Sequence, residues 1–559
     1  MKTYSVRPFH GETLLGHLLH HRGIVDAKDR EQFLHPSYDL GMNDPFLLSD
    51  MQKAVERISL AIEKNEKITI WSDYDADGIP GAVVLSDFFK MIGYSNTGVY
   101  IPHRHNEGFG MNAEGVDSLA INDTKLIITI DCGITDVEEV ALANELGVDV
   151  IITDHHLPGP VLPAAFAIVD PKISPEYPDE MICGSGVVFK LVQALLKNNR
   201  RGVPEGKEKW LLDMVGIATL SDMVPLKGEN RVFASFGLKV LRKSPRVGLK
   251  KLLSSLKISQ KDLTEDDIAF MITPRINVAS RMGTPIDAFR LLSTDNEEEA
   301  EELVERLNGL NNERKGVVGA IVKEIQTKIM ERGLGNKKVI VLGNPSWRPA
   351  VLGLVANSLI REHRKPVYLW GRAEDGTLKG SCRSEGQTDV VALMHAVTDD
   401  IFVDRGGHKM SGGFSVLTEN IHLLDEALNV SYEKIASTKT LAEEEWIADH
   451  LLSVDDIDFR LWDIVEKLAP FGIDNAKPVF LLKSVTPADI KYFGKQREHL
   501  EIVLMKQNGK KMPAISFFAG EEDKFHRLSV GKAFDLVATL EKSMFRNFPE
   551  LRLRIVDIQ

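Results

Sequence analysis

The sequence predicts an α/β protein of several domains, organised around a parallel sheet with crossover helices. Short apolar runs at 68–71, 126–130 and 148–153 alternate with helical stretches, which is typical of strands buried between helices. The chain has 559 residues, of which 43% are hydrophobic, and this is enough for several cores. An acidic residue follows each of these runs within two positions. Because ligands collect beyond the carboxyl ends of parallel strands, we expect these residues to share one crevice.

Composition and periodicity divide the chain into five segments. Residues 1–45 are expected to form a short helical segment, and residues 46–294 a Rossmann-like lobe that ends in helices with basic loops. Residues 295–333 are expected to form a connecting helix, and residues 334–445 a second, glycine-rich α/β lobe. Over residues 455–559, short alternating strands predict a small β-barrel.

The connecting helix is predicted from a proline-free stretch, Thr294 to Arg332, that begins with glutamates and continues with periodic apolar residues. Thr294 and Asp295 are suitable N-caps, and a glutamate run suits a helix N-terminus. We expect one long helix that bridges the two lobes. A break near Gly309 and an ordinary pair of surface helices are the alternatives.

Composition excludes several classes of protein. No apolar stretch approaches the roughly 20 residues that a membrane helix needs, and the first residues lack the apolar core of a secretory signal. The cysteines, Cys132, Cys183 and Cys382, have no metal-like spacing, so we expect a reduced, cytoplasmic location. The net charge of −13 argues against coating nucleic acid by bulk charge, although it leaves room for a local basic groove.

The acidic residues that follow the apolar runs predict a metal site. A fourth apolar run, 217–220, is also expected to be a strand and precedes a further aspartate, so four distant segments are expected to converge. The residues concerned are Asp73, Asp75, Asp77, Asp131, Asp154, His155, His156 and Asp222. Carboxylates at this density repel one another, and cations are their simplest partners. An aspartate-rich or calcium-type turn and two ordinary surface histidines are the alternatives for single parts of the set.

The types of ligand indicate which metal is expected. Oxygen ligands with one imidazole favour magnesium or manganese over zinc, which prefers sulfur and several histidines. Two such ions, about 3.5–4 Å apart, can clamp an in-line displacement at phosphorus. The site therefore suits hydrolysis of a phosphate ester.

These residues resemble the motifs of the DHH phosphoesterase superfamily, and nearly the whole chain resembles its RecJ branch, the 5′→3′ single-strand-specific exonucleases. The matching segments occur in the family's order. They are 73–78, 130–133, 154–156, 220–225, 274–282, 381–384, 406–413 and 470–475. The resemblance implies a DHH catalytic domain over 46–294, a DHHA1 substrate-binding domain over 334–445 and an OB-fold nucleic-acid-binding domain over 455–559.

The resemblance also implies roles for individual residues. Two divalent ions, manganese or magnesium, would be held by Asp75, Asp77, Asp131, His155 and Asp222, with Asp131 between them and Asp73 as a helper. His156 would lie over the scissile phosphate, as an acid or as a stabiliser of developing charge. In the second lobe and the connecting region, the residues implied for the 5′-terminal phosphate are Arg275, Asn277, Arg281, Ser381, Arg383, Gly407 and His408. Structural ion pairing is the alternative for Arg275 and Arg281.

In the C-terminal segment, basic residues alternate with aromatic ones, as in surfaces that stack unpaired bases and follow phosphates. They are Lys491 to Arg497, Phe517, Phe518, Phe545 to Phe548, Arg552 and Arg554. Phe517 and Phe518 could equally belong to the core.

The function implied is a metal-dependent 5′→3′ exonuclease that degrades single-stranded DNA to mononucleotides in repair and recombination. A helicase and a single-strand-binding protein are the implied partners, and a monomer without membrane attachment is expected. One alternative is a phosphoesterase for short oligonucleotides or cyclic dinucleotides, although such relatives lack the barrel. The other is a replication scaffold without catalysis, although such relatives lose ligand residues that this chain retains.

Overall fold

The computed structural model describes residues 3–331, 333–398, 400–436, 445–494, 497–517, 519, 525–543 and 548–559. These fall into two compact units. The larger unit comprises Asn43–Asp222 and Gly237–Leu441. The smaller unit comprises Met1–Met42, Met223–Phe236 and Ala442–Gln559. The domain boundaries expected above remain predictions.

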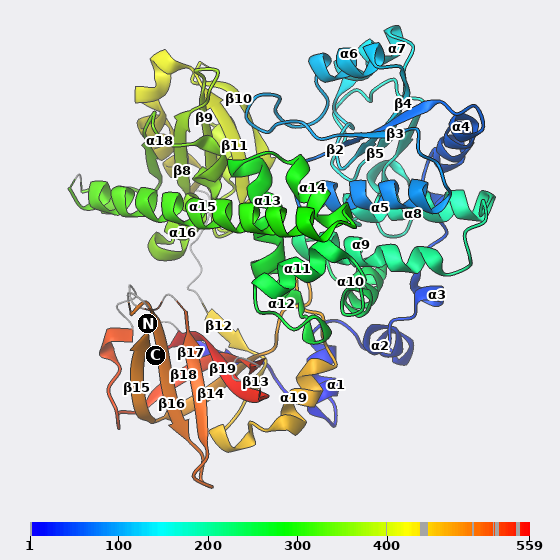
Figure 1. Cartoon of the computed structure of the whole chain (residues 1–559). Coiled ribbons are helices and arrows are strands. Elements are labelled where there is room, and N and C mark those ends of the chain that lie inside the picture. The colour runs from blue at the N-terminus through cyan, green and yellow to red at the C-terminus, as the bar shows by residue number, and fades with distance from the viewer. Residues whose placement is uncertain are drawn as a thin grey trace. The chain divides into compact units, whose positions relative to one another are not determined.

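The first lobe of the larger unit is built on a five-stranded parallel sheet in the order β3-β2-β4-β5-β6 (Figure 1). Its strands are β2 (Lys67–Ser72), β3 (Thr97–Tyr100), β4 (Thr124–Ile130), β5 (Asp149–Thr153) and β6 (Ala167–Val169). On one face lie α4 (Met51–Glu63), α5 (Gly78–Met91) and α8 (Gly184–Asn198); on the other lie α6 (Ala113–Ile121) and α7 (Val137–Glu145). The predicted parallel sheet with crossover helices is confirmed.

The fourth apolar run is not a strand. Residues 217–220 lie in the helix α9 (Leu212–Ser221), which ends at Asp222. Most of its residues are buried, so the helix is apolar on nearly every side and lacks the amphipathic period that identifies a surface helix. The prediction of a strand was therefore wrong, although the aspartate that follows still reaches the same edge of the sheet.

A helical region joins the two lobes. It follows α10 (Gly228–Leu241), whose residues up to Phe236 belong to the smaller unit. It contains α11 (Val247–Ser255), α12 (Glu265–Asp267), a π-helical turn (Ile268–Ile272), α13 (Thr273–Met282) and α14 (Ile286–Ser293). The connecting helix is α15 (Glu297–Glu331), with 35 residues and no break at Gly309. It packs on α11, α13 and α14, and further along on α16 (Pro349–His363) of the second lobe.

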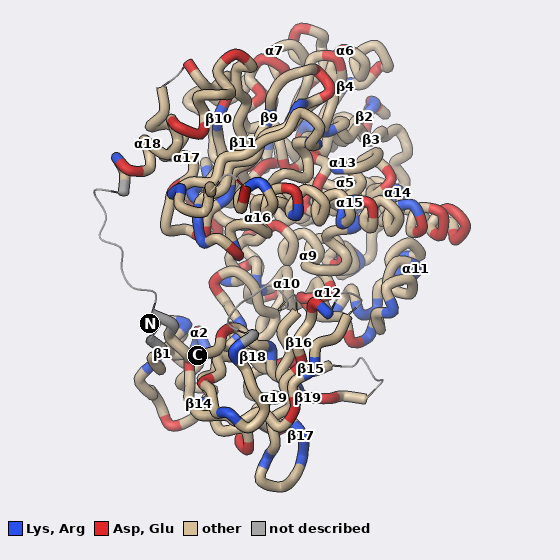
Figure 2. Tube along the Cα trace, turned by 90° about the vertical axis from the view of Figure 1, so that its left-hand side faces the viewer, with Lys and Arg blue, Asp and Glu red and all other residues tan. Residues whose placement is uncertain are grey.

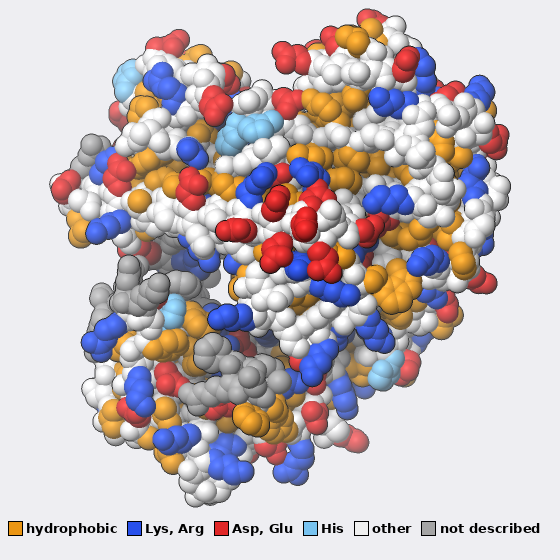
Figure 3. All heavy atoms as spheres, in the orientation of Figure 1, with side chains coloured by type: hydrophobic (Ala, Val, Ile, Leu, Met, Phe, Trp, Pro, Cys, Tyr) orange, Lys and Arg blue, Asp and Glu red, His pale blue; other side chains and the backbone are white. Residues whose placement is uncertain are grey.

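The N-terminal end of α15 is capped by a different residue from those predicted. Its first turn is capped by Asn296, whose Oδ1 accepts the backbone N–H groups of Glu298 and Glu299, rather than by Thr294 or Asp295. Thr294 instead accepts the N–H of Asn296. Acidic residues gather at the N-terminal end of the helix (Figures 2 and 3), where their charges complement its dipole.

The second lobe has a mixed five-stranded sheet in the order β10-β11-β9-β8-β7. Its strands are β7 (Ile340–Gly343), β8 (Val367–Arg372), β9 (Leu378–Arg383), β10 (Phe402–His408) and β11 (Ser411–Val416). Its helices are α16 (Pro349–His363), α17 (Val390–His395) and α18 (Leu424–Ala436). One core joins the sheet to α15 and α16, and a second joins it to α17 and α18.

The smaller unit contains a seven-stranded sheet in the order β13-β14-β18-β19-β17-β16-β15. Its strands are β13 (His450–Leu451), β14 (Val479–Val485), β15 (Pro487–Phe493), β16 (His499–Met505), β17 (Lys511–Ser516), β18 (Phe534–Ser543) and β19 (Glu550–Ile558). Within the described residues, the two outer strands do not pair, so the sheet is open rather than a closed barrel. β13 takes the outer edge of β14, which ends the sheet there.

The N-terminal segment belongs to this smaller unit. β1 (Thr3–Val6) pairs with β12 (Glu445–Ala448), and α1 (Leu14–His20), α2 (Ala27–Leu34) and α3 (Tyr38–Gly41) follow. Leu18, Leu19 and Phe33 share a core with the seven-stranded sheet and with α19 (Phe459–Glu466). Of the helices that the structure describes, none combines the length and the apolar character needed to cross a membrane.

Candidate metal and phosphate site

The loop between β2 and α5 presents three aspartates at the carboxyl edge of the sheet. Asp77 accepts hydrogen bonds at 2.7 Å from the backbone N–H groups of both Gly184 and Ser185, which open α8. Asp75 Oδ1 accepts the N–H groups of Asp77 and Gly78 at 2.7 and 3.2 Å. A Cβ at Gly78 would lie 2.5 Å from the carbonyl oxygen of Asp73, so only glycine fits there. The loop is thus held rigidly against α8.

Asp131 follows β4 and lies at the centre of the site. Its backbone has a positive φ of 60°, its residue is 3% exposed, and its Oδ1 has no hydrogen-bond partner within the described residues. Burial, followed by repulsion from Asp77 and Asp75, raises the pKa of this carboxyl well above its usual range. A left-handed non-glycine residue with an unpartnered buried oxygen is a mark of a functional position.

His155, which follows β5, joins the carboxylates. Its Nε2 lies 3.1 Å from Asp131 Oδ1, 3.7 Å from Asp222 Oδ2 and 3.8 Å from Asp77 Oδ2. Burial lowers the pKa of the imidazole, which favours the neutral form that binds metal ions. Burial and the neighbouring Asp77 raise the pKa of Asp222 well above its usual range.

His156 is oriented by Asp154. The Nδ1 of His156 lies 2.7 Å from Asp154 Oδ1, and the same carboxylate accepts the backbone N–H groups of Ile134 and His155. Burial alone would lower the pKa of His156, but the hydrogen bond and the charge of Asp154 outweigh it and raise the pKa to about 9. Asp154 therefore fixes the orientation of the imidazole ring through Nδ1.

The donor atoms fit divalent cations. Three groups have one ligand atom per residue within 4.8 Å of one another: Asp77 with His155 and Asp222; Asp73 with Asp75 and Asp131; and Asp131 with His155 and His156. Asp73 and Asp131 each have a buried Oδ1 without a partner among the described residues. Buried carboxyls that repel one another, with oxygens left unpaired, lack only a positive charge.

Four of the residues expected to bind the terminal phosphate, Ser381, Arg383, Gly407 and His408, lie near one another in the sheet of the second lobe. Strand register places Arg383 of β9 and His408 of β10 opposite the same residue of β11, Ser411, and Ser381 lies on the same face of β9 as Arg383. Gly407 has a φ of 129° and lies against Gly412, where a Cβ would come within 2.5 Å. The strand register thus brings Ser381, Arg383, Gly407 and His408 to the same end of β9, β10 and β11.

The two candidate arginines of α13 have different surroundings. Arg275 donates to the carbonyl oxygen of Met271 and to Asn308, so its guanidinium is held within the helical region. Arg281 has a buried Nε without a partner in the described part of the chain, and the burial of Arg281, together with the charges of Arg104 and Arg314, lowers its pKa to about 10. Arg383 also affects this pKa. Asn277, one turn before Arg281, has a buried Oδ1 without a partner among the described residues.

Two residues at this edge were missed by the sequence reasoning. Arg104 stacks on Tyr74, with 5.0 Å between its guanidinium carbon and the ring centroid, and it acts on the pKa values of Asp73, Arg281 and Arg383. Phe109, which is half exposed, meets the ring of His156 edge-on. The available signal was a basic, glycine-containing loop after a strand, since such loops often carry function.

In the smaller unit, part of the expected aromatic and basic surface is present. Arg554 and Arg552 lie over the ring of Phe517, at 4.1 and 5.8 Å from its centroid, and Phe517 is partly exposed. Phe518, Lys495 and residues 545–547 lie outside the described residues.

Fold and site together define an α/β protein with a buried carboxylate–histidine centre suited to divalent cations. Comparison with known families agrees: residues 67–219 match the DHH family N-terminal domain, 336–435 the DHHA1 domain and 448–557 the RecJ OB domain. The chain is 34% identical over 557 residues to the single-stranded-DNA-specific exonuclease RecJ of Bacillus subtilis, covering 98% of this chain and 68% of that protein. It is 30% identical over 482 residues to RecJ of Escherichia coli, covering 84% of this chain and 82% of that protein.

Solved structures give the same result. The crystal structure of RecJ from Thermus thermophilus in complex with Mn²⁺ matches with a TM-score of 0.81 and 26% identity, over 100% of this chain and 79% of that chain. The chain belongs to the RecJ family.

Proposed function

We propose that the protein is a metal-dependent exonuclease that degrades single-stranded DNA from its 5′ end to mononucleotides. The observation that carries this proposal is the arrangement of Asp77, His155 and Asp222 beside Asp73, Asp75 and Asp131 at one edge of the sheet. The relatives are single-stranded-DNA-specific exonucleases, and a structural relative was crystallised with Mn²⁺. Manganese or magnesium is the cofactor, since the donors are mainly oxygens.

The chemistry is phosphodiester hydrolysis. Two divalent ions, when bound, would activate a water and stabilise charge on the phosphate oxygens. Asp131 would be the ligand shared between the two ions, since it belongs to two of the groups of donor atoms. Asp154 fixes the ring of His156 through Nδ1, so that Nε2 can donate to an oxygen of the reacting phosphate.

Three arginines would set the 5′→3′ direction of digestion by binding the terminal phosphate. Arg104 acts electrostatically on both Arg281 and Arg383, and among the described residues none of the three forms an ion pair with a carboxylate, although Asp75 acts on Arg281 from a distance. A doubly charged terminal phosphate therefore suits them better than an internal phosphodiester. Ser381, Gly407 and His408 border Arg383 on the sheet. Of the two candidate arginines on α13, we assign this role to Arg281, because Arg275 is committed to Met271 and Asn308.

The alternatives are less favoured. An enzyme for short oligonucleotides or cyclic dinucleotides would not need the OB domain, which this chain carries over 448–557. A scaffold without catalysis would not retain the full set of carboxylates and histidines. We further propose a monomeric, cytoplasmic protein that works with a helicase and a single-strand-binding protein, since an enzyme restricted to single strands needs a source of them.

The test uses a 3′-labelled single-stranded oligonucleotide beside a blunt duplex of the same sequence, each with manganese or magnesium and each with a chelator. We expect label-bearing products that shorten progressively from the 5′ end, with metal present and with the duplex spared. Cleavage of dinucleotides without digestion of the long strand would favour the short-substrate alternative. Release of the 3′ label first would contradict the proposed polarity.

A further inference from the structure

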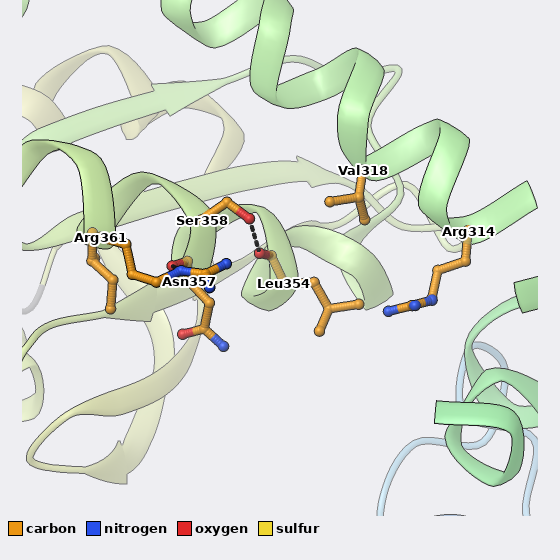
Figure 4. Close-up of a pocket in the computed structure, with 7 residues that line it drawn as sticks. Arg314, Val318, Leu354, Asn357, Ser358 and Arg361 are labelled. Atoms are coloured by element: carbon orange, nitrogen blue, oxygen red, sulfur yellow. Dashed lines mark hydrogen bonds between the residues drawn. The ribbon is translucent and has the colours of Figure 1, made fainter. Parts of the chain in front are cut away.

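A cavity of about 500 Å³ lies between α15 and α16, outside the carboxylate–histidine centre. Arg314 reaches toward it from α15 and Arg361 from the last turn of α16, with Leu354 and Asn357 between the two guanidinium groups (Figure 4). The rest of the lining consists of Val318, Ser358 and Ile360. Among the described residues that line the cavity, none is acidic.

Arg314 is the deeper of the two arginines. Its Nε is buried and has no hydrogen-bond partner among the described residues, and burial lowers the pKa of the guanidinium. Arg361 is exposed and donates from Nε to the carbonyl oxygen of Asn357, while its guanidinium faces the cavity (Figure 4). A partly buried guanidinium without a counter-charge costs free energy, which an anion in the cavity would recover.

The cavity continues the arginine cluster of the active site. The charge of Arg314 acts on Arg281, which is also influenced by Arg104, Arg383 and Asp75. Arg383 packs against Gly353, one turn before Asn357 on α16: a Cβ at Gly353 would lie 2.6 Å from its Nη2. Arg314 therefore belongs to the same group of mutually influencing arginines as Arg281, Arg104 and Arg383, in a chain whose net charge is −13.

We propose that this cavity is a second phosphate subsite, which binds a nucleotide phosphate between Arg314 and Arg361. The apolar side chains of Val318, Leu354 and Ile360 offer a surface for the sugar or base, and Asn357 and Ser358 offer hydrogen bonds. The inference rests on the proposed function. The phosphate can come from the DNA strand or from a released nucleoside monophosphate, because the recognition chemistry is the same for both.

The test measures binding in chelator, without hydrolysis. Wild-type protein, Arg361→Glu and Asn357→Asp are titrated with a fluorescent 5′-phosphorylated oligothymidylate and, by calorimetry, with thymidine 5′-monophosphate. Asn357→Asp keeps the volume of the side chain and adds a negative charge to the lining of the same cavity. Arg372→Glu is the matched control, since Arg372 is an exposed arginine of the same lobe outside the cavity. Melting temperatures of all four proteins show that each is folded.

We expect both cavity variants to weaken nucleotide binding about tenfold or more, the worth of one charge-assisted hydrogen bond, and the control to bind like wild type. A loss confined to the oligonucleotide identifies the strand as the source, and a loss with the monophosphate identifies the product. If both variants bind both ligands like the control, the inference is overturned while strand degradation by wild type still stands. If wild type neither binds nor degrades the strand, the proposed function fails as well.

Discussion

Asp131 combines features that a protein usually avoids. Its backbone is left-handed, its carboxyl is buried among other carboxyls, and within the described residues its Oδ1 accepts no hydrogen bond, although His155 Nε2 lies 3.1 Å away. Each feature costs stability, and the structure maintains them together by packing: a Cβ at Gly184 would lie 2.7 Å from Asp131, so α8 presses directly on it. The arrangement is understandable as a site prepared for cations rather than for folding.

Replacing Asp131 by asparagine should reduce nuclease activity at least about 100-fold, because it removes a charge shared by two ligand groups. Asparagine tolerates the left-handed backbone and removes a repelling charge, so the metal-free protein should melt no lower than wild type. Activity assays and melting with and without manganese check both points. Wild type should gain stability with manganese, and the variant should gain much less.

The matched control is Asp123→Asn. Asp123 has nearly the same backbone conformation, with a φ of 61°, but its side chain is 93% exposed. This variant should keep wild-type activity and the wild-type response to manganese. An active Asp131→Asn protein would remove Asp131 from the metal site.

Phe109 offers a second test at the level of a side chain. Its half-exposed ring beside His156 is suited to stack on the base next to the scissile phosphate. Phe109→Ala should raise KM for single-stranded DNA about tenfold, since stacking on an aromatic ring contributes about 1–3 kcal/mol per base, whereas Phe109→Tyr should retain it. Phe166→Ala is the control, because Phe166 is similarly exposed but precedes β6 and so lies at the amino ends of the strands, away from the site at their carboxyl ends. Equal effects of the two alanine variants would contradict the stacking role.

Among the helices, α9 shows how an element can be placed by contacts rather than by its own pattern. Gly216 packs against Gly237, where a Cβ would come within 2.6 Å, so two helices touch along their backbones. Asp213, in the first turn of α9, is buried and accepts hydrogen bonds from Arg246 and Ser244. Arg246 also pairs with Asp87 of α5 at 2.7 Å. This network fixes the N-terminal end of α9 against α5, and so helps to position the helix that Asp222 follows.

Arg246→Met should destabilise the larger unit by about 3–5 kcal/mol, because it leaves the buried carboxylate of Asp213 without its counter-charge. Urea unfolding monitored by fluorescence measures the effect. Arg290→Met is the control: Arg290 also pairs with a carboxylate, that of Glu299, but its side chain is 51% exposed, and it should cost less than about 1 kcal/mol. Equal costs for the two variants would show that the Arg246 network is not a determinant of stability.

The two compact units of the molecule do not follow the order of the sequence, because each is built from segments that are distant along the chain. The smaller unit is assembled from the N-terminal segment, residues 223–236 and the OB domain. Arg231, from the middle segment, stacks 3.4 Å from the ring centroid of Phe33 and donates to the carbonyl oxygens of Phe33 and Leu468. Burial lowers the pKa of Arg231 to about 9. One buried guanidinium therefore joins all three segments.

Ending the chain after residue 436 should therefore affect residues far from the deletion. Leu18, Leu19 and Phe33 would lose the sheet that covers them, and β1 would lose its partner β12. We expect trypsin to cleave at Arg22 and Arg30 much faster than in the full-length protein, with the products identified by mass spectrometry. If residues 7–36 stay as protected as in the full chain, the N-terminal segment does not depend on the OB domain.

Several features could be predicted from the sequence because they are local. Strands ending in Ser72, Ile130 and Thr153 have apolar runs of the right length, and the long helix has an unbroken pattern from its glutamates onward. The strand predicted at 217–220 was wrong because a short, wholly apolar run fits a buried helix as well as a buried strand. The capping residue of α15 was misplaced by one position, since Asn296, Asp295 and Thr294 are all good caps.

The family, the parallel sheet and the candidate carboxylates and histidines could be predicted from the sequence, because strand ends and the order of motifs are local properties of the chain. The folded structure was needed to show that Asp222 follows a helix, that Arg104 and Phe109 lie beside the predicted site, and that the sheet of the OB domain, within its described residues, is open. It was also needed to show that the N-terminal segment packs with the C-terminal domain. These outcomes depend on contacts between residues distant in sequence, where packing and the pairing of buried charges outweigh local preference.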